Sequence, residues 1–331
     1  MINGYFYPHS TTKTLTPYYE YFMNHLKNEV NFLNIYSKSG IGILDIFKYI
    51  LKVDVAFMNF PEEMIDKRFG FWQFLIFIFV ITPFFKLTKR KLVWTMHNRK
   101  SHYSKNKRIK KYLYQFLLKH SDIIVVHASV GKDIVGDYNK KLLSKVFYFP
   151  HPVIDMGIPM SENEPIYDFI IWGRIAPYKS VDSFLEYLHT NKIQHKYKIL
   201  IAGKVQTQEL EVAISKYLTE NIILINRDLS DDELIEYISS SRIVLFPYIH
   251  ESVLASGALV YSLNFRKPII GPHAGAFLDL SYENLVFTFR TYEDIEKIDT
   301  SLFDTTRFSS YVKEVSWEVY TSELMKKISK T

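Results

Sequence analysis

Short runs of branched and aromatic apolar residues recur along the whole chain, and they constrain its fold more than any other feature. Most of them do not alternate between polar and apolar residues, as expected for strands buried on both faces of a parallel sheet. Amphipathic segments of helix length separate them, among them 107–119, 181–190, 208–219 and 231–240. The alternation predicts an α/β protein with doubly wound parallel sheets. The predicted strands are 53–59, 91–96, 122–127, 145–149, 167–172, 198–202, 221–225, 243–247, 268–271 and 285–288.

A proline-rich segment at residues 150–165 divides this pattern, and the alternation of strands and helices restarts after it. A chain of 331 residues can form two domains that each bury a core. We therefore expect an N-terminal Rossmann-like domain over 1–155 and a second one that begins at 156. The architecture implies an interdomain cleft.

Composition excludes several classes of protein. Hydrophobic residues make up 47% and charged residues 23% of the chain, which is typical of a folded globular protein. The absence of cysteine excludes a disulfide scaffold, a thiolate nucleophile and a cysteine metal site. The first residues lack the pattern of a signal peptide, so we expect a cytoplasmic protein.

The positive charge is concentrated in residues 86–119, which contain twelve Lys or Arg and no Asp or Glu. The rest of the chain sums to about −6, from 29 basic and 35 acidic residues. Such a block favours a polyanionic partner: membrane lipid, a pyrophosphate-linked acceptor or nucleic acid. No recognised nucleic-acid-binding module accompanies it, so we expect no nucleic acid partner.

A nearly uncharged run, 69–85, precedes the basic block. Three interpretations are open: a helix half-buried in the N-terminal core, an interfacial helix that dips into a bilayer, or a membrane span. A span needs roughly 20 apolar residues, and Gln73 and Pro83 interrupt this run. Together, residues 69–119 are our candidate for a peripheral contact with the inner face of the cell membrane.

The segment GRIAPYK, 173–179, directly follows the predicted strand 167–172. Gly173 allows a tight turn at the carboxyl end of a strand, where α/β folds bind ligands. Arg174 and Lys179 could grip a diphosphate, Arg with its fork and Lys as a point charge. The alternative is an ordinary turn with two solvated cations.

A second polar constellation lies at 246–257, between a predicted strand and a short helix. Ser256 and Gly257 stand where that helix should begin, at free backbone N–H groups and the positive end of the helix dipole. Ser256 would add a hydroxyl donor, and Gly257 would let a phosphate close on the backbone. The alternative is a plain N-cap serine followed by a glycine.

In that order, these motifs resemble the donor domain of GT-B glycosyltransferases, and most of all the large group 1 family of retaining enzymes that use UDP- or GDP-sugars. Ala202-Gly203 after the next strand and KPII at 267–270 continue the likeness. The N-terminal half is similar too, and the resemblance covers almost the whole chain. Its motifs there are Pro17-Tyr18, DVAFMNFPE at 54–62, VWTMHN at 93–98 and DIIVVH at 122–127.

The resemblance implies a role for each matching position. Arg174 and Lys179 would neutralise the donor pyrophosphate, with Gly173 and Gly203 beside it, and Ser256 and Gly257 would bind the distal phosphate. His97 would lie near the transferred sugar, where it could hydrogen-bond a hydroxyl or position the reacting groups. The alternative for His97 is a capped strand end with a satisfied histidine. The motif SWE at 316–318 would start a last helix, within 313–331, that returns to the first domain and leaves 156–312 as the nucleotide-sugar domain.

Two features depart from the family. Its Glu-x7-Glu signature is absent, because Val253 and Tyr261 occupy the two positions. The second Glu usually holds the donor ribose, so that role is unassigned, and Glu251 is our candidate for a contact with the donor sugar. An Asp-x-Asp metal motif is also absent, so we expect no essential metal ion and no further cofactor. The cationic side chains would then stabilise the departing diphosphate.

The motifs and the family resemblance thus predict a glycosyltransferase that moves a sugar from a UDP- or GDP-sugar to a glycan or lipid-linked acceptor, in surface polysaccharide or glycan biosynthesis. The resemblance alone implies retention. His97 and Glu251 are the candidate catalytic residues. One alternative is an inactive GT-B relative that binds sugar nucleotides or serves as an assembly subunit. The other is a basic nucleic-acid binder.

Overall fold

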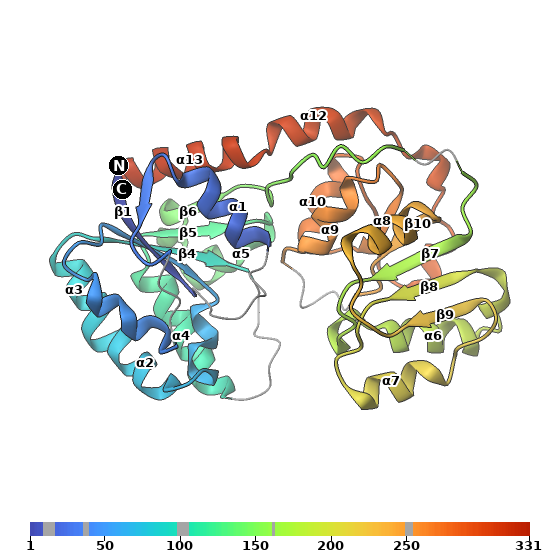
Figure 1. Cartoon of the computed structure of the whole chain (residues 1–331), viewed down its shortest axis with the longest axis horizontal. Coiled ribbons are helices and arrows are strands. Elements are labelled where there is room, and N and C mark those ends of the chain that lie inside the picture. The colour runs from blue at the N-terminus through green and yellow to red at the C-terminus, as the bar shows by residue number, and fades with distance from the viewer. Residues whose placement is uncertain (9–16, 36–39, 98–105, 161–162, 249–253) are drawn as a thin grey trace. The chain divides into compact units, whose positions relative to one another are not determined.

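The computed structural model describes residues 1–8, 17–35, 40–97, 106–160, 163–248 and 254–331. The chain forms two compact units (Figure 1). Unit 1 contains Met1–Pro152 and Val315–Thr331, and unit 2 contains Val153–Glu314.

Unit 1 is built on a parallel sheet with the strand order β2-β1-β3-β4-β5-β6. Its strands are β1 (Ile2–Tyr7), β2 (Val30–Phe32), β3 (Val55–Asn59), β4 (Lys91–Met96), β5 (Ile123–Val126) and β6 (Val146–Tyr148). All residues of β3 and β5 are buried, as an unalternating apolar strand requires.

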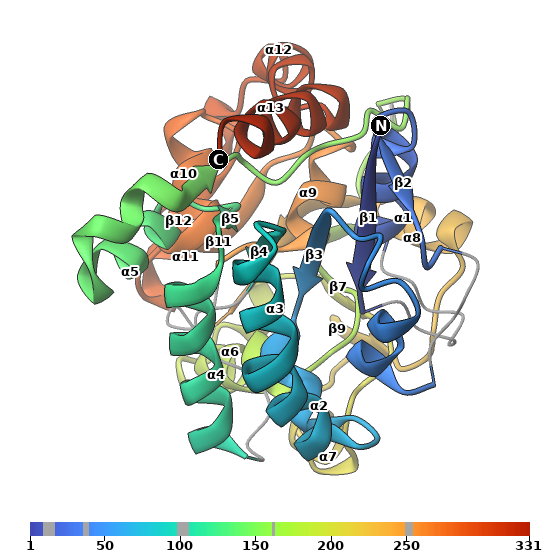
Figure 2. The same cartoon turned by 90° about the vertical axis from the view of Figure 1, so that its left-hand side faces the viewer.

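Helices cover both faces of this sheet (Figures 1 and 2). Helices α2, α3 and α4 lie on one side, and α1 and α13 on the other. The helices are α1 (Pro17–Leu26), α2 (Gly70–Ile76), α3 (Thr82–Leu87), α4 (Lys107–His120), α5 (Val130–Tyr138) and α13 (Trp317–Lys330), with short 3-10 helices η1 (Gly42–Lys48), η2 (Pro61–Asp66) and η4 (Lys140–Lys145).

Helices α2 and α3 are joined by a π-helical turn, η3 (Phe77–Ile81). Together they form one helix, Gly70–Leu87, which among the described residues is long and apolar enough to cross a membrane. Its inner face, including Phe77, Ile81 and Phe85, is buried in unit 1. The helix is therefore half-buried in unit 1, as one of the three interpretations expected, and 39% of it lies inside the protein.

Unit 2 repeats the architecture, with a parallel sheet in the order β12-β11-β10-β7-β8-β9. The strands are β7 (Tyr167–Trp172), β8 (Ile199–Ala202), β9 (Ile222–Ile225), β10 (Ser241–Leu245), β11 (Ile269–Pro272) and β12 (Phe287–Phe289). The helices are α6 (Val181–Thr190), α7 (Gln208–Ser215), α8 (Asp231–Ser239), α9 (Gly257–Leu263), α10 (Gly275–Tyr282), α11 (Tyr292–Ile295) and α12 (Thr306–Glu314); the 3-10 helices are η5 (Pro177–Lys179), η6 (Gln194–Lys196) and η8 (Thr300–Leu302).

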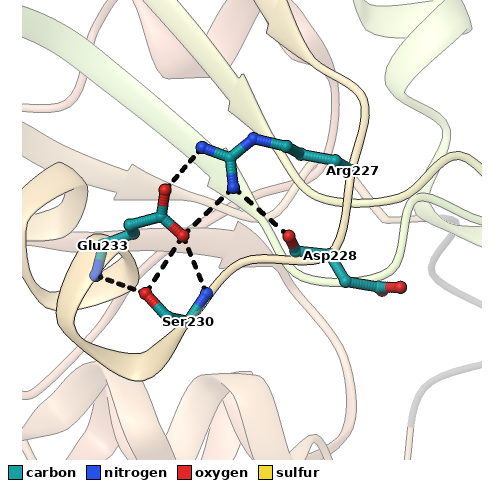
Figure 3. A network of polar contacts seen from close by, with 4 residues as sticks. All are labelled: Arg227, Asp228, Ser230 and Glu233. Atoms are coloured by element: carbon teal, nitrogen blue, oxygen red, sulfur yellow. Dashed lines mark hydrogen bonds and ion pairs between the residues drawn. The ribbon is translucent and has the colours of Figure 1, made fainter.

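Helix α8 begins with a capping box (Figure 3). The hydroxyl of Ser230 accepts a hydrogen bond from the amide of Glu233, and the Glu233 carboxylate accepts one from the amide of Ser230, at 2.9 Å. Arg227 donates to the same carboxylate, and these hydrogen bonds lower the pKa of Glu233 to about 2. The N-terminus of α8 is thus fixed just after β9.

All ten strands expected from the sequence are present, with boundaries shifted by at most two residues. The sequence analysis missed β1 and β2. The parallel sheets and their helices confirm the expected α/β class with two Rossmann-like domains.

Candidate functional site

Two glycines meet at the carboxyl ends of β7 and β8 in unit 2. Gly173 has φ +83° and Gly203 has φ +142°, and both angles favour glycine. A Cβ on Gly203 would lie 2.2 Å from the carbonyl oxygen of Gly173, so no larger residue fits between the two loops. Amides and carbonyls join these loops further: Ile175 donates to Lys204 at 3.0 Å, and Gln206 donates to Ile175 at 2.8 Å. Both positions that the sequence analysis singled out therefore require glycine for their backbone geometry.

Lys179 lies beneath the Gly173 turn with only 3% of its surface exposed. Its Nζ donates a hydrogen bond to the carbonyl oxygen of Trp172 at 2.8 Å and lies 5.6 Å from the centre of the Tyr248 ring. A Cβ on Gly173 would lie 3.2 Å from this nitrogen. Burial lowers the pKa of Lys179 to about 7. The alternative of a solvated cation is thus wrong for Lys179.

Arg174, in contrast, is exposed. Within the described residues its guanidinium makes no ion pair. Its backbone is part of the tight turn after Gly173, while its side chain is available to a ligand. The two cations of GRIAPYK therefore differ: one is buried at the strand end, and the other is exposed.

Ser256 is the N-cap of α9, and its Oγ accepts a hydrogen bond from the amide of Leu259 at 3.2 Å. The same hydroxyl hydrogen-bonds Tyr248, whose pKa is nevertheless raised by its burial. Gly257 follows as the first residue of the helix, and a Cβ there would meet no described heavy atom within 4 Å. The predicted helix start is confirmed, and the space above Gly257 is open to a ligand.

Tyr261, at the position of the family's second Glu, packs its ring against Trp172 with a centroid distance of 5.2 Å. Trp172 in turn donates from Nε1 to Ser262 Oγ at 2.9 Å. These contacts hold α9 against the end of β7. An aromatic side chain that packs against Trp172 therefore occupies this position, where the family has a carboxylate.

In unit 1, His97 follows the carboxyl end of β4. Its Nε2 and the Oδ1 of Asn59 are 2.8 Å apart, and its ring stacks on Phe60 at 4.3 Å with an interplanar angle of 15°. Tyr18 approaches its edge at 5.3 Å. Burial, and then the neighbouring His151, lower the pKa of His97 to about 3, so the ring is neutral at physiological pH.

His127 stands in the equivalent place after β5. Its Nδ1 donates to the carbonyl oxygen of Phe149 at 2.9 Å, so its Nε2 accepts from the hydroxyl of Tyr18 at 2.9 Å. The hydroxyl of Tyr320 is 3.2 Å from that of Tyr18 and donates to it. This chain of hydrogen bonds joins α13, α1 and β5.

His151, after β6, completes the cluster. Its Nδ1 donates to the carbonyl oxygen of Pro152 at 3.0 Å, and its ring lies 5.4 Å from Tyr18 and 5.3 Å from His127. Burial lowers its pKa to about 4 and that of His127 well below the ordinary value. The carboxyl edge of the unit 1 sheet thus presents three neutral imidazoles around one phenol.

Sequence reasoning found His97 in this cluster and missed Asn59, His127 and His151. The available signal was the position of His127, directly after a predicted buried strand, as for His97. The partners of Tyr18 could not be read from the sequence, because they lie up to 302 residues away.

Among the other predicted features, Glu251 lies outside the described residues, as do 98–105 of the basic block. In the parts that are described, no group of three or more His, Asp or Glu residues could hold a metal ion.

The comparisons with known proteins fit this geometry. The family model "Glycosyl transferases group 1" matches residues 160–270, which run from before β7 into β11 and include every candidate residue of unit 2. The chain carries a group 1 glycosyltransferase domain. It is therefore a glycosyltransferase, as the sequence motifs predicted. The sequence matches none of the curated proteins.

Solved structures share the fold of this chain over all or most of its length. Anabaena Alr3699/HepE, in complex with UDP and glucose, has a TM-score of 0.68 at 11% identity, with 100% of both chains covered. Sucrose-phosphate synthase from Thermosynechococcus elongatus has a TM-score of 0.64 at 12% identity, with 99% of both chains covered. A UDP-forming α,α-trehalose-phosphate synthase from Burkholderia vietnamiensis has a TM-score of 0.55 at 8% identity, covering 82% of this chain and 70% of that one. The fold is GT-B.

Proposed function

We propose that this glycosyltransferase moves a sugar from a UDP- or GDP-sugar to a glycan or lipid-linked acceptor, with retention of the anomeric configuration, in the synthesis of a surface polysaccharide or glycan. The observation that carries the proposal is the buried Lys179 at the Gly173 turn. Burial lowers the pKa of Lys179 to about 7. The negative charge of a bound diphosphate would stabilise the protonated form of this lysine. The neighbours with UDP in their complexes support a UDP-sugar in particular.

In this proposal the carboxyl edge of unit 2 binds the diphosphate. Lys179 supplies a point charge, Arg174 a forked guanidinium, and the start of α9 a hydroxyl and free amides. As the bond between the anomeric carbon and the diphosphate oxygen breaks, negative charge grows on the leaving group. The two cations stabilise that charge. The acceptor oxygen bonds to the anomeric carbon as its proton passes to the departing diphosphate oxygen. No step in this scheme requires a metal ion.

The outer face of the helix Gly70–Leu87 supports a membrane-bound acceptor. This face is apolar, although a helix on the surface of a soluble domain usually presents polar residues there. Its most exposed members are Phe71 (55%), Trp72 (60%), Phe79 (69%), Val80 (45%) and Leu87 (85%). Since the inner face is part of the core, the helix would lie in the plane of a bilayer and would not cross it.

Basic residues flank this apolar face. Helix α4 packs beside it through Phe74 and Tyr112, with a centroid distance of 6.0 Å, and carries the exposed Lys107, Arg108 and Lys111. Part of the basic block serves the fold, because Lys110 pairs with Asp66. The remaining cations match the anionic headgroups of the cytoplasmic leaflet. We therefore propose a cytoplasmic enzyme held at the inner face of the cell membrane.

One observation favours the alternative, an inactive relative that binds sugar nucleotides. Tyr261 packs against Trp172 where the family usually has a carboxylate for the donor ribose. Such a protein would bind a nucleotide without turning over its sugar.

A turnover assay separates the two. The full-length protein is incubated with UDP- and GDP-sugars and with a membrane extract that contains lipid-linked glycans, and free nucleotide diphosphate and labelled product are measured. Acceptor-dependent release of UDP or GDP supports the transferase. Binding of a donor without release, in extract and in buffer, favours the inactive relative.

A further inference from the structure

A hydrogen bond between Asn59, at the end of β3, and His97, directly after β4, defines the chemical state of His97. Asn59 is the last residue of β3 and is 1% exposed, and it pairs in register with Thr95, two residues before His97. Its Oδ1 lies 2.8 Å from His97 Nε2. An amide oxygen can only accept a hydrogen bond, so the hydrogen belongs to Nε2.

Neighbouring rings prevent the imidazole of His97 from turning over, which would exchange the positions of its two nitrogens. Phe60, with φ +48°, stacks on one face of the imidazole, and Tyr18 meets its edge at 5.3 Å. The groups that face His97 from the elements packed around it are Tyr18 from α1, His127 after β5 and His151 after β6. Among the described residues, no carboxylate stands in that group to favour an imidazolium.

A neutral imidazole with hydrogen on Nε2 keeps a lone pair on Nδ1. Within the described structure, no hydrogen bond joins Nδ1 of His97 to another group, and the residue as a whole is half-buried. Such a nitrogen accepts a hydrogen bond from a hydroxyl. It cannot donate a proton and offers no charge to a phosphate.

We propose that Asn59 is a positioning residue that holds His97 in the neutral Nε2–H tautomer, so that Nδ1 accepts a hydrogen bond from a hydroxyl of the sugar substrate. This proposal rests on the proposed function for the identity of the ligand. The tautomer itself does not depend on it. Unit 1 would then recognise a neutral polyhydroxyl group, in contrast to the cationic, anion-binding edge of unit 2.

The test uses full-length protein labelled with ¹⁵N-histidine. NMR correlations between ring protons and nitrogens report which imidazole nitrogen is protonated, and His97→Gln assigns the signals. We expect His97 to carry hydrogen on Nε2 alone from pH 5 to pH 8. In Asn59→Asp, a carboxylate of the same size replaces the amide and favours the imidazolium, so the pKa of His97 should rise and both nitrogens should be protonated at the acidic end. Asn31→Asp, an exposed position in the same unit, is the control and should leave His97 unchanged.

The second readout is sugar transfer. In Asn59→Asp, kcat/KM should fall by about tenfold or more as His97 becomes protonated, with the largest loss at low pH, while nucleotide affinity stays the same. Asn59→Leu, with an apolar side chain of similar size, should give a mixture of tautomers and a loss that does not change with pH. Thermal melts show whether each variant is folded.

Hydrogen on Nδ1 of His97 in the wild type would overturn the proposal, and so would an Asn59→Asp variant with wild-type tautomer and titration. A tautomer change with no effect on transfer would overturn the role of Nδ1 as an acceptor. If the wild type transfers no sugar from any donor, the proposed function fails, and the NMR experiment still decides the role of Asn59.

Discussion

The side-chain nitrogen of Lys179 donates a hydrogen bond to the carbonyl oxygen of Trp172, the last residue of β7, at a distance of 2.8 Å. This bond places a buried amine at the point where the chain turns through Gly173. It compensates in part for the loss of water around the amine, and burial nevertheless lowers the pKa of Lys179 to about 7. In the free enzyme at slightly alkaline pH, Lys179 is therefore neutral in most molecules. It becomes charged when an anion binds.

This state predicts proton uptake on binding. Above pH 7 the free enzyme has a largely neutral Lys179, and a bound diphosphate raises its pKa, so each bound nucleotide should take up close to one proton at pH 8 and about half a proton at pH 7. Affinity should fall as the pH rises from 7 to 9. Calorimetric titration at pH 8 in buffers with different ionisation enthalpies measures the uptake. Apparent enthalpies that are equal in all buffers would contradict it, and Lys179→Gln should abolish the difference.

Gly257 allows a test that separates function from stability. A methyl group at this first residue of α9 meets no described atom within 4 Å, and alanine is the better helix former by about 0.5 to 1 kcal/mol. Gly257→Ala should therefore keep or raise the melting temperature and weaken nucleotide binding about tenfold, because the methyl group occupies space proposed for the phosphate.

The matched control is Gly136→Ala in α5 of unit 1, where the added methyl would make ordinary contacts with Leu143 at 3.5 Å. This variant should bind nucleotide as the wild type does. If Gly257→Ala also retains full affinity, the start of α9 is no phosphate site.

Glu62 predicts a pH-dependent stability. Burial raises the pKa of this carboxyl to about 7 in the folded protein, from 4.5. Between these values the folded state binds more protons than the unfolded state, so this group lowers the free energy of unfolding as the pH rises through that window. At pH 8 the folded protein must hold an ionised, buried carboxylate, at a cost on the order of 3 kcal/mol.

The variant Glu62→Gln removes this ionisation. Its stability relative to the wild type, measured from urea denaturation midpoints, should increase between pH 5 and pH 8. The exposed Glu29→Gln serves as the control and should show no such trend. A constant difference between Glu62→Gln and wild type across this range would mean that the pKa of Glu62 is not raised in the folded state.

The apolar face of Gly70–Leu87 predicts binding to anionic vesicles. Wild-type protein should sediment with vesicles that contain phosphatidylglycerol, and less with pure phosphatidylcholine. The double variant Trp72→Glu/Phe79→Glu should lose at least about tenfold in partition, because two exposed aromatic residues leave the interface. Val212→Glu, at an exposed apolar position in unit 2, should have no effect.

The charge contribution has its own variant. Lys107→Glu/Lys111→Glu should weaken vesicle binding about tenfold or more, and this loss should shrink at high salt, since headgroup attraction is screened. If these variants leave both vesicle binding and turnover on a lipid-linked acceptor unchanged, the apolar face of Gly70–Leu87 and the basic residues beside it do not bind a membrane.

The sequence predicted most of the fold because buried parallel strands have a strong local signal. Tyr167–Trp172 and Lys91–Met96 were predicted with the boundaries that the structure has. The two missed strands lack this signal: β1 contains Asn3 and Gly4, and β2 has only three residues. Strand β1 pairs with β3, and β2 pairs with β1, so both depend on contacts between residues far apart in the chain.

The residues of the candidate site could be predicted only where a short sequence motif determines the local backbone structure. Gly173 was found from its place at the end of a predicted strand and Gly203 from the family resemblance, and both have backbone angles that favour glycine. The burial of Lys179 could not be predicted, since it depends on Tyr248, which follows β10, as well as on the neighbouring Trp172. The cluster of His127 and His151 around Tyr18 is likewise a consequence of tertiary structure.

The central claim is that unit 2 binds a nucleoside diphosphate through Arg174 and Lys179. Calorimetric titration with UDP, GDP, ADP and CDP tests it most directly, on wild type, on Arg174→Ala and on Arg174→Ala/Lys179→Ala. Because Arg174 is exposed, its single variant should fold normally. We expect micromolar binding of UDP or GDP in preference to the others, weakened about tenfold in the single variant and abolished in the double variant. Binding of none of the four nucleotides by the wild type, or equal binding by the folded double variant, would contradict the account.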